Sequence, residues 1–240
     1  MESVRISFLN SDEVIDDSDI YFLEQFLSQE RLERNLKFRK EEDRKRSILA
    51  ESLVLFCLMK DYGISPDRIC FGRDVYGKPF LRSHRTIHFN LSHSGNWVAC
   101  ILGTGPVGID IEQCRQDIDP ISTGQIFSAR EKEILQALNT EDRLERFYQL
   151  WTLKESYTKA LGAGIGRGFE TFKFEWDELD AIDLYDPLDQ GNSDFQFQSF
   201  SLDKEHISAA CFPSGRSVPD VSFILLSELL KDMKRIESRD

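Results

Sequence analysis

Two long helical segments that begin and end alike place the strongest limit on how this chain can fold. Residues 42–62 and residues 141–161 both open with the triplet Glu-Asp-Arg, and each is followed at the same distance by a glycine, Gly63 or Gly162. Apolar residues recur in both segments at helical spacing, and glycine is a common helix stop. The repetition predicts an α+β fold with two related α/β halves.

An alternating apolar segment precedes each of these helices. The sequences VRISFL (4–9) and VGIDIE (107–112) show the period of two that is typical of a strand. The sequence GTGP at 103–106 is the best turn signal near the middle of the chain. We therefore expect an N-terminal half at 1–105 and a C-terminal half at 106–240.

The charge balance excludes some classes of function. A net charge of -12 and a pI of about 4.9 give no electrostatic footprint for nucleic acid or for an anionic membrane. The longest apolar run, 53–59, is too short to span a bilayer, and residues 1–10 contain no signal-like segment. The five cysteines match no zinc or disulfide spacing, so we expect reduced thiols in a soluble cytoplasmic protein.

One segment departs from the general acidity. Residues 31–46 contain eight lysines and arginines against four acids, a local net charge of +4. Such a run is usually a solvated helix face. It could also bind an anionic ligand.

Two acidic side chains share one face of the strand at 107–112. Alternation turns Asp110 and Glu112 to the side opposite Ile109 and Ile111. Two acids on one strand face usually indicate a solvated surface. The helix that follows gives a reason to consider another role.

The second long helix supplies a third carboxylate. On a helical wheel Glu155 falls beside Trp151, within the apolar stripe of a helix that is apolar nearly all round. A carboxylate buried there is costly unless it is paired or binds a cation. Lys159, four residues on, could form a plain ion pair with it. Alternatively, Asp110, Glu112 and Glu155 form an all-oxygen set that suits Mg2+, an ion that usually keeps substrate phosphates in its shell.

Weaker signals point to phosphate in the N-terminal half. His93 lies in the small-residue sequence SHSG, where a turn would offer the backbone N–H groups of Ser92 and its neighbours. A histidine in a turn is more often merely exposed. Lys78, in the turn YGKP, offers a positive charge.

Five motifs occur in order over the middle of the chain: GKPFL (77–81), FNLSHSGNWV (89–98), VGIDIE (107–112), FSAREKE (127–133) and FYQLWTLKESYTKALGAGI (147–165). With these motifs the chain closely resembles the 4'-phosphopantetheinyl transferases, in length and layout the large type that activates surfactin synthetase. The resemblance implies the fold of that family, with its halves related by pseudo-twofold symmetry. A duplicated chain of this kind could complete its site as a monomer.

The resemblance implies a reaction and assigns residues to it. Such enzymes transfer the phosphopantetheine arm of coenzyme A to a serine hydroxyl of a peptidyl or acyl carrier protein and release adenosine 3',5'-bisphosphate. By motif, Asp110, Glu112 and Glu155 would hold Mg2+, or Mn2+, on the pyrophosphate. Lys159 would neutralise or protonate the leaving phosphate. Glu155 or a metal-bound water would take the proton from the carrier serine.

The resemblance also assigns residues that bind coenzyme A. Arg31, Arg34 and Ser47 occupy positions like those that bind its 3'-phosphate, and this chain has arginine where relatives often have lysine. Arginine should serve the same phosphate through bidentate contacts. The other contacts would come from Lys78, Ser92, His93, Asp110 and Lys159.

The segment 113–126 resembles the region of the family that meets the carrier protein. It contains three isoleucines, Ile118, Ile121 and Ile126. Many carriers are acidic and would be repelled by a chain of net charge -12. We therefore expect an apolar helix-in-groove contact at these isoleucines, which tolerates like net charges.

Two other functions compete with this assignment. A non-catalytic coenzyme A or carrier-binding protein of the same fold would have no evident use for Asp110, Glu112, Glu155 and Lys159 together. A Mg2+ nuclease built on Asp110 and Glu112 would need a basic groove for its polyanionic substrate, and this acidic sequence predicts none.

Overall fold

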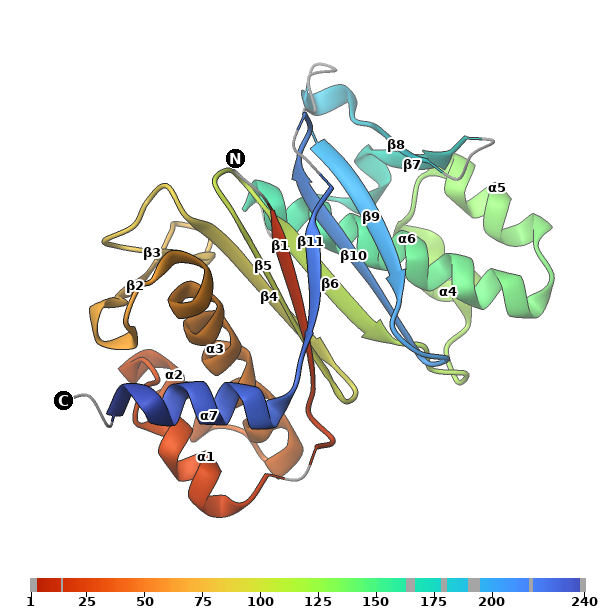
Figure 1. Ribbon diagram of the computed structural model, residues 1–240. Coiled ribbons are helices and arrows are strands. Elements are labelled where there is room, and N and C mark those ends of the chain that lie inside the picture. The colour runs from red at the N-terminus through yellow and green to blue at the C-terminus, as the bar shows by residue number, and fades with distance from the viewer. Residues whose placement is uncertain are drawn as a thin grey trace. The chain divides into compact units, whose positions relative to one another are not determined.

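The computed structural model describes residues 4–13, 15–162, 167–177, 181–189, 195–215 and 218–237. Helices and strands form an α+β fold with two compact units (Figure 1). The first unit contains the described residues up to 105 together with 218–237, and the second contains those from 106 to 215. In the part of the chain described here, no helix combines the length and the apolar character needed to cross a membrane.

The first unit is built on a four-stranded sheet in the order β11-β1-β5-β4. β1 (Arg5–Asn10) pairs antiparallel with β5 (Trp97–Gly103), which pairs antiparallel with β4 (His88–Ser94). The shorter elements of this unit are α1 (Asp17–Glu24), α2 (Gln29–Asn35), the 3-10 helix η1 (Pro66–Arg68), and the two-stranded sheet of β2 (Phe71–Arg73) and β3 (Pro79–Leu81).

The long helix α3 (Glu41–Tyr62) packs on β4 and β5 and supplies much of the apolar core of the first unit. Gly63 caps its C-terminus at φ 65°. A positive φ favours glycine, which has no Cβ to clash. The predicted helix and its predicted stop are therefore confirmed.

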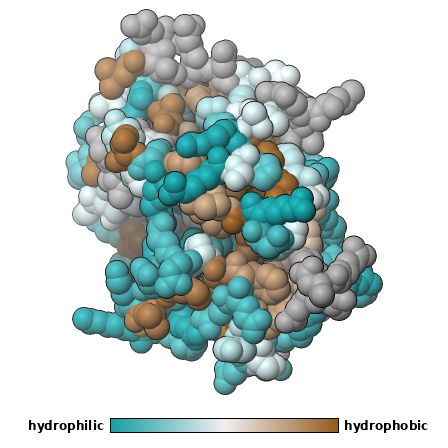
Figure 2. Space-filling view, turned by 90° about the vertical axis from the view of Figure 1, so that its left-hand side faces the viewer, coloured by the Kyte–Doolittle hydropathy of each residue, from teal (hydrophilic) through white to brown (hydrophobic). Residues whose placement is uncertain are grey.

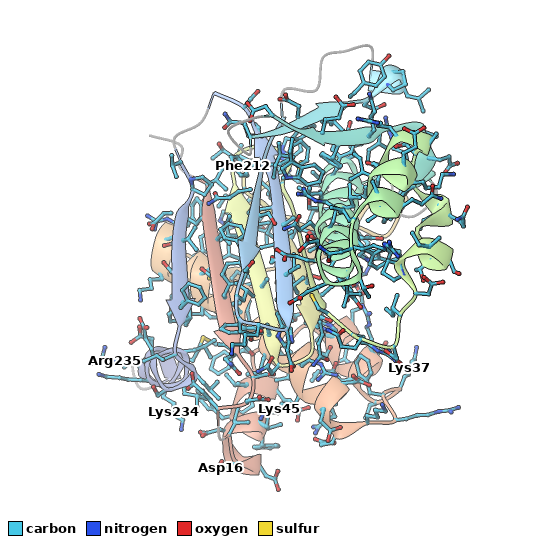
Figure 3. All side chains as sticks on the ribbon, turned by 90° about the vertical axis from the view of Figure 1, so that its right-hand side faces the viewer. Asp16, Lys37, Lys45, Phe212, Lys234 and Arg235 are labelled. Atoms are coloured by element: carbon cyan, nitrogen blue, oxygen red, sulfur yellow. The ribbon has the colours of Figure 1, made fainter. Side chains whose placement is uncertain are left out.

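The C-terminal segment belongs to the first unit, which corrects the expected assignment of all residues from 106 to 240 to the second half. β11 (Asp220–Ile224) pairs parallel with β1, and α7 (Leu226–Glu237) buries its apolar side in the core of the first unit. Lys234 of α7 forms an ion pair with Asp19 of α1 at 2.6 Å, and its charge also reaches Asp16 at the α1 cap (Figure 3). Pairing between the two ends of a sequence leaves no local signal that could have predicted this.

The second unit contains a three-stranded antiparallel sheet in the order β6-β10-β9. Its strands are β6 (Gly108–Gln113), β9 (Phe195–Ser201) and β10 (His206–Pro213), and a separate two-stranded sheet joins β7 (Lys173–Trp176) to β8 (Ile182–Tyr185). The helices are α4 (Pro120–Thr123), α5 (Ala129–Ala137) and α6 (Thr140–Leu161), with 3-10 helices η2 (Gly124–Ile126), η4 (Phe169–Thr171) and η5 (Pro187–Asp189).

The long helix α6 packs against β6 and β10 and organises the core of the second unit. Its C-terminus is capped by Gly162 at φ 70°, as predicted. A capping box begins α5: the backbone nitrogen of Glu131 donates to Ser128 Oγ, and the backbone nitrogen of Ser128 donates to Glu131 Oε2. The surface is largely hydrophilic where Figure 2 shows it, with apolar residues in separate small groups.

Candidate active site

Gly108 brings strand β6 into direct contact with helix α6. A Cβ atom at this position would overlap the carbonyl oxygen of Ser156 and lie 2.6 Å from the backbone nitrogen of Ala160. Only glycine therefore allows the strand and the helix to come this close. Since side chains alternate along a strand, Asp110 and Glu112 share the face of Gly108 and point toward α6.

Asp110 forms an ion pair with Lys159 of α6. Lys159 Nζ lies 2.6 Å from Asp110 Oδ1 and also donates to the carbonyl of Ile109 at 3.3 Å. Asp110 is 3% exposed, and its own carbonyl accepts a hydrogen bond from Ser208 Oγ at 2.6 Å. The sequence left open a plain ion pair between Lys159 and Glu155; the ion pair that the structure shows is with Asp110.

The charges of Asp110 and Lys159 also act on Glu155. Burial raises the pKa of Glu155, the nearby charge of Asp110 raises it further, and Lys159 opposes both effects. Two carboxylates that repel each other in a half-buried setting favour a cation between them. The structure thus places Asp110, Glu155 and Lys159 near one another, three of the residues that the sequence analysis named.

The charge of Glu112 reaches Cys114 and Tyr148. Its charge contributes to raising the pKa of Cys114 to about 11, after the larger effects of burial and of Glu145. Burial first, and more weakly Glu112, also raise the pKa of Tyr148.

Among the described residues, no three His, Cys, Asp or Glu side chains are grouped so that they could hold a metal ion together. The donors nevertheless fit a hard cation chemically. Asp110, Glu112 and Glu155 offer only oxygen, and Asp110 and Glu155 repel each other. The expected three-carboxylate metal site therefore stays a prediction.

Lys154, next to Glu155 in the sequence, forms a buried ion pair that the sequence analysis did not identify. Its Nζ lies 3.0 Å from Glu131 Oε2 and donates to the carbonyls of Phe169 and Phe172, and both charged side chains are fully buried. Burial lowers the pKa of Lys154 to about 8, although Glu131 opposes this effect. The pair ties α6 to α5 and to the segment around η4.

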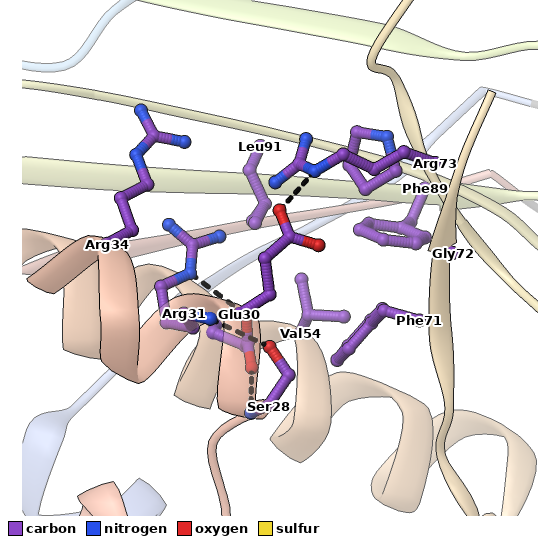
Figure 4. A pocket seen from close by; sticks show the side chains of 12 residues that line it. Ser28, Glu30, Arg31, Arg34, Val54, Phe71, Gly72, Arg73, Phe89 and Leu91 are labelled. Carbon is purple, nitrogen blue, oxygen red and sulfur yellow. Dashed lines mark hydrogen bonds and ion pairs between the residues drawn. The ribbon is translucent and has the colours of Figure 1, made fainter. Parts of the chain in front are cut away.

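A pocket in the first unit gathers three arginines. Arg31, Arg34 and Arg73 line a pocket whose other walls include Phe71 and Phe89 (Figure 4). Burial lowers the pKa of Arg34, and the positive charges of Arg31 and Arg73 lower it further. Guanidinium groups that repel one another in this way favour an anion. The sequence predicted Arg31 and Arg34 and missed Arg73, which only the hairpin of β2 and β3 brings here.

Ser47 lies behind Arg31. Arg31 Nη1 donates to Ser47 Oγ at 3.1 Å, and Ser47 is fully buried. The structure therefore places Ser47 as a support for Arg31. The buried carboxylate of Glu51 contacts the same arginine, with Oε2 lying 2.9 Å from Arg31 Nε.

Ser92 and His93 lie on strand β4, which corrects the expectation that they form a turn. They pair with Ala99 and Val98 of β5, and the turn follows at Gly95, whose φ is 55°. Strand pairing continues further than predicted because the residue that favours positive φ comes only at this position.

Lys78 approaches the opposite end of β4. Burial lowers the pKa of His88, and the charge of Lys78 lowers it further. His93 lies five positions along the strand from His88, about 16 Å along the backbone. The structure thus places Lys78 beside His88, a histidine to which the sequence assigned no chemistry.

A groove in the second unit lies along the expected carrier-docking segment. Its walls come from the segment that follows β6, from the start of α6 and from the turn between β9 and β10. Ile118 lines this groove, and both Ile118 and Ile121 also pack against the apolar core. Ile126 is 43% exposed. The residues lining the groove are Cys114, Gln116, Ile118, Asp119, Pro120, Thr140, Glu141, Arg143, Leu144, Glu145, Ser201, Asp203, Lys204 and Ile207.

Comparison with known proteins gives consistent matches over both units. Residues 106–211 match the 4'-phosphopantetheinyl transferase superfamily, and residues 16–103 match the N-terminal region of a 4'-phosphopantetheinyl transferase. The chain is 30% identical over 208 residues to the 4'-phosphopantetheinyl transferase Sfp of Bacillus subtilis (strain 168), covering 85% of this chain and 90% of that protein. A second Bacillus subtilis 4'-phosphopantetheinyl transferase is 31% identical over 185 residues, 77% of this chain and 81% of that protein.

A relative from another genus agrees. The 4'-phosphopantetheinyl transferase gsp of Aneurinibacillus migulanus is 36% identical over 162 residues, 68% of this chain and 67% of that protein. The sequence motifs, the α+β fold and these matches lead to one conclusion: the chain belongs to the 4'-phosphopantetheinyl transferase superfamily and is a transferase of the Sfp-like type.

Proposed function

We propose that this enzyme transfers the 4'-phosphopantetheine arm of coenzyme A to a serine hydroxyl of an apo peptidyl or acyl carrier protein. The serine oxygen bonds to the phosphorus that carries pantetheine, the bond from that phosphorus to the bridging oxygen breaks, and adenosine 3',5'-bisphosphate leaves. The observation that carries the proposal is the convergence of Asp110, Glu155 and Lys159 between β6 and α6. Because the nucleophile belongs to the carrier, this centre needs only positioning and charge.

The second unit supplies the charged groups for the transfer. Asp110, Glu112 and Glu155 would hold Mg2+, for which their oxygen donors are suited, and the bound ion would neutralise charge on the pyrophosphate. Lys159 supplies positive charge, or a proton, for the leaving phosphate. Either Glu155 or a water molecule held at this centre would take the proton of the serine hydroxyl.

The first unit supplies contacts to phosphate. Arg31 and Arg34 bind the 3'-phosphate of coenzyme A, with Arg73 as a third cation in the same pocket and Ser47 supporting Arg31. The apolar walls of the pocket suit the nucleoside next to that phosphate. Lys78, Ser92 and His93 are proposed to contact phosphate as well.

The groove beside α4 is the proposed contact for the carrier. Ile118 lines it, Ile121 lies in the same segment, and Ile126 is the most exposed of the three isoleucines. An amphipathic helix of a carrier can place its apolar side in such a groove.

A single assay tests the reaction. The full chain is incubated with coenzyme A, Mg2+ and an apo carrier, and the carrier is weighed by mass spectrometry. We expect a gain of about 340 Da, the mass of the transferred group. Asp110→Ala should abolish the gain at intact fold, whereas Glu133→Gln, which removes an exposed acid of α5, serves as the control. Wild-type rates for Asp110→Ala at saturating Mg2+ would contradict the assigned centre.

A further inference from the structure

Glu51 of α3 holds the beginning of helix α2 through both of its carboxylate oxygens. Oε1 accepts a hydrogen bond from the backbone nitrogen of Ser28 at 2.6 Å, and Oε2 accepts one from Arg31 Nε at 2.9 Å. Ser28 is the N-cap of α2, and Glu51 is 5% exposed. One buried carboxylate therefore fixes both the start of the helix and the first arginine of the pocket.

A second contact completes the orientation of Arg31. Its Nη1 donates to the buried Ser47 Oγ at 3.1 Å. A guanidinium is a rigid planar fork, so bonds at Nε and Nη1 determine where its other N–H groups point. Arg31 lines the pocket with Arg34, and Figure 4 shows the two guanidinium groups on the same side of it.

The pocket offers a natural contrast in Glu30. This acid forms an ion pair with Arg73, but its side chain is 56% exposed and that of Arg73 is 36% exposed. Ion pairs at such exposure are weak and easily exchanged for another anion. In the pair of Arg31 and Glu51 the side chains are only 13% and 6% exposed. Glu51 and Glu30 thus carry the same charge in two different settings.

We propose that Glu51 is a positioning residue that aims Arg31 at a phosphate monoester of the ligand. The inference rests on the proposed function, in which that monoester is the 3'-phosphate of coenzyme A. Two effects of Glu51 oppose each other: its negative charge weakens anion binding, and its two hydrogen bonds preorganise the arginine that binds the anion. If removing the charge of Glu51 weakens binding of the phosphate ligand, positioning dominates; if it strengthens binding, the charge dominates.

The test is isothermal titration calorimetry of the full chain with adenosine 3',5'-bisphosphate and with adenosine 5'-monophosphate, which lacks only the 3'-phosphate. We expect Glu51→Gln to raise the Kd of the bisphosphate about tenfold, the usual scale for loss of a charge-assisted contact. The Kd of the monophosphate should not change. Ser47→Ala should act in the same direction with a smaller effect. Glu30 carries the same charge as Glu51 but has no positioning role. Glu30→Gln should therefore lower the Kd of the bisphosphate.

Several outcomes would overturn the inference. If Glu51→Gln lowers the Kd of the bisphosphate as Glu30→Gln does, the charge of Glu51 dominates. If Glu51→Gln raises the Kd of both nucleotides equally, the substitution damages the pocket in general. If thermal unfolding shows that Glu51→Gln is not folded, Ser47→Ala decides, and its unchanged preference for the bisphosphate would reject positioning. A wild-type chain without any preference for the bisphosphate would instead reject the proposed phosphate pocket, and so separates the two failures.

Discussion

Gly108 of β6 lies so close to Ser156 of α6 that a Cβ atom would overlap the serine carbonyl oxygen. The next residue on the same strand face is Asp110, and the residue one turn along the helix from Ser156 is Lys159, with which Asp110 forms its 2.6 Å ion pair. The close approach of the two backbones therefore allows β6 and α6 to bring these charges together.

Replacing Gly108 by alanine should damage both stability and activity. The methyl group meets backbone atoms, which cannot rotate away, so α6 must shift from β6. Overpacking of this kind costs about 1–3 kcal/mol, and transfer should fall because Lys159 and Glu155 move with the helix. Urea unfolding and the carrier mass assay measure the two effects.

Gly124→Ala is a suitable control in the same unit. A Cβ atom at Gly124 would first meet a methyl group of Leu135 at 3.2 Å, a side chain that can adjust. Its effects should be clearly smaller. Wild-type transfer by Gly108→Ala would show that the distance between strand and helix does not set the activity.

Replacing Glu155 by glutamine should stabilise the chain while it abolishes transfer. Because the folded state raises the pKa of Glu155, the ionised form is disfavoured by folding. This destabilisation is present above the folded pKa and disappears as the pH falls below the unfolded one. The Tm of Glu155→Gln should therefore lie above that of wild type at neutral pH.

Thermal unfolding over a range of pH checks this expectation. The difference in Tm between Glu155→Gln and wild type should shrink as the medium becomes acidic. Glu133→Gln, at an exposed site on α5, should show no such difference. A lower Tm for Glu155→Gln at neutral pH would mean that the carboxylate is stabilised in the fold, contrary to its raised pKa.

Local signals predicted the parts of the fold that local chemistry determines. Gly63 and Gly162 end the two long helices at positive φ, at the positions that the sequence predicted. These positions depend on hydrogen bonds within a few residues. The alternation at Asp110 likewise predicted which side of the strand it occupies.

Contacts between distant segments could not be predicted in this way. The parallel pairing of β11 with β1, the approach of Arg73 to Arg34, and the support of Arg31 by Glu51 all join residues far apart in the sequence. In a single sequence each of these residues resembles an ordinary surface charge or a terminal apolar segment. Their roles follow only from the fold.

The buried ion pair of Lys154 and Glu131 should be essential for the second unit. Lys154→Met leaves Glu131 charged and fully buried, and breaking a buried pair costs about 3–5 kcal/mol. Adding Glu131→Leu removes that charge, so the double variant should lose less than the sum of the single ones. Urea unfolding of the four proteins gives the coupling energy, and strictly additive losses would contradict a direct pair.

The proposed docking surface can be tested most cleanly at Ile126. Ile118 and Ile121 pack partly into the core, so charged replacements there would disturb folding as well as binding. Ile126 is 43% exposed, and Ile126→Asp should keep the wild-type Tm. Because an aspartate desolvated against an apolar helix lacks a partner, the KM for the carrier should rise about tenfold or more at little change in kcat.

Leu188→Asp provides the matched control for Ile126→Asp. Leu188 is an exposed apolar residue of the same unit, 66% exposed, and lies outside the segment 113–126 that resembles the carrier-binding region. Its replacement should leave the carrier KM at the wild-type value, which would exclude a general effect of added negative charge on a chain that is already acidic. Equal carrier KM values for wild type and Ile126→Asp would remove Ile126 from the docking surface, whereas equal increases in both variants would point to long-range repulsion.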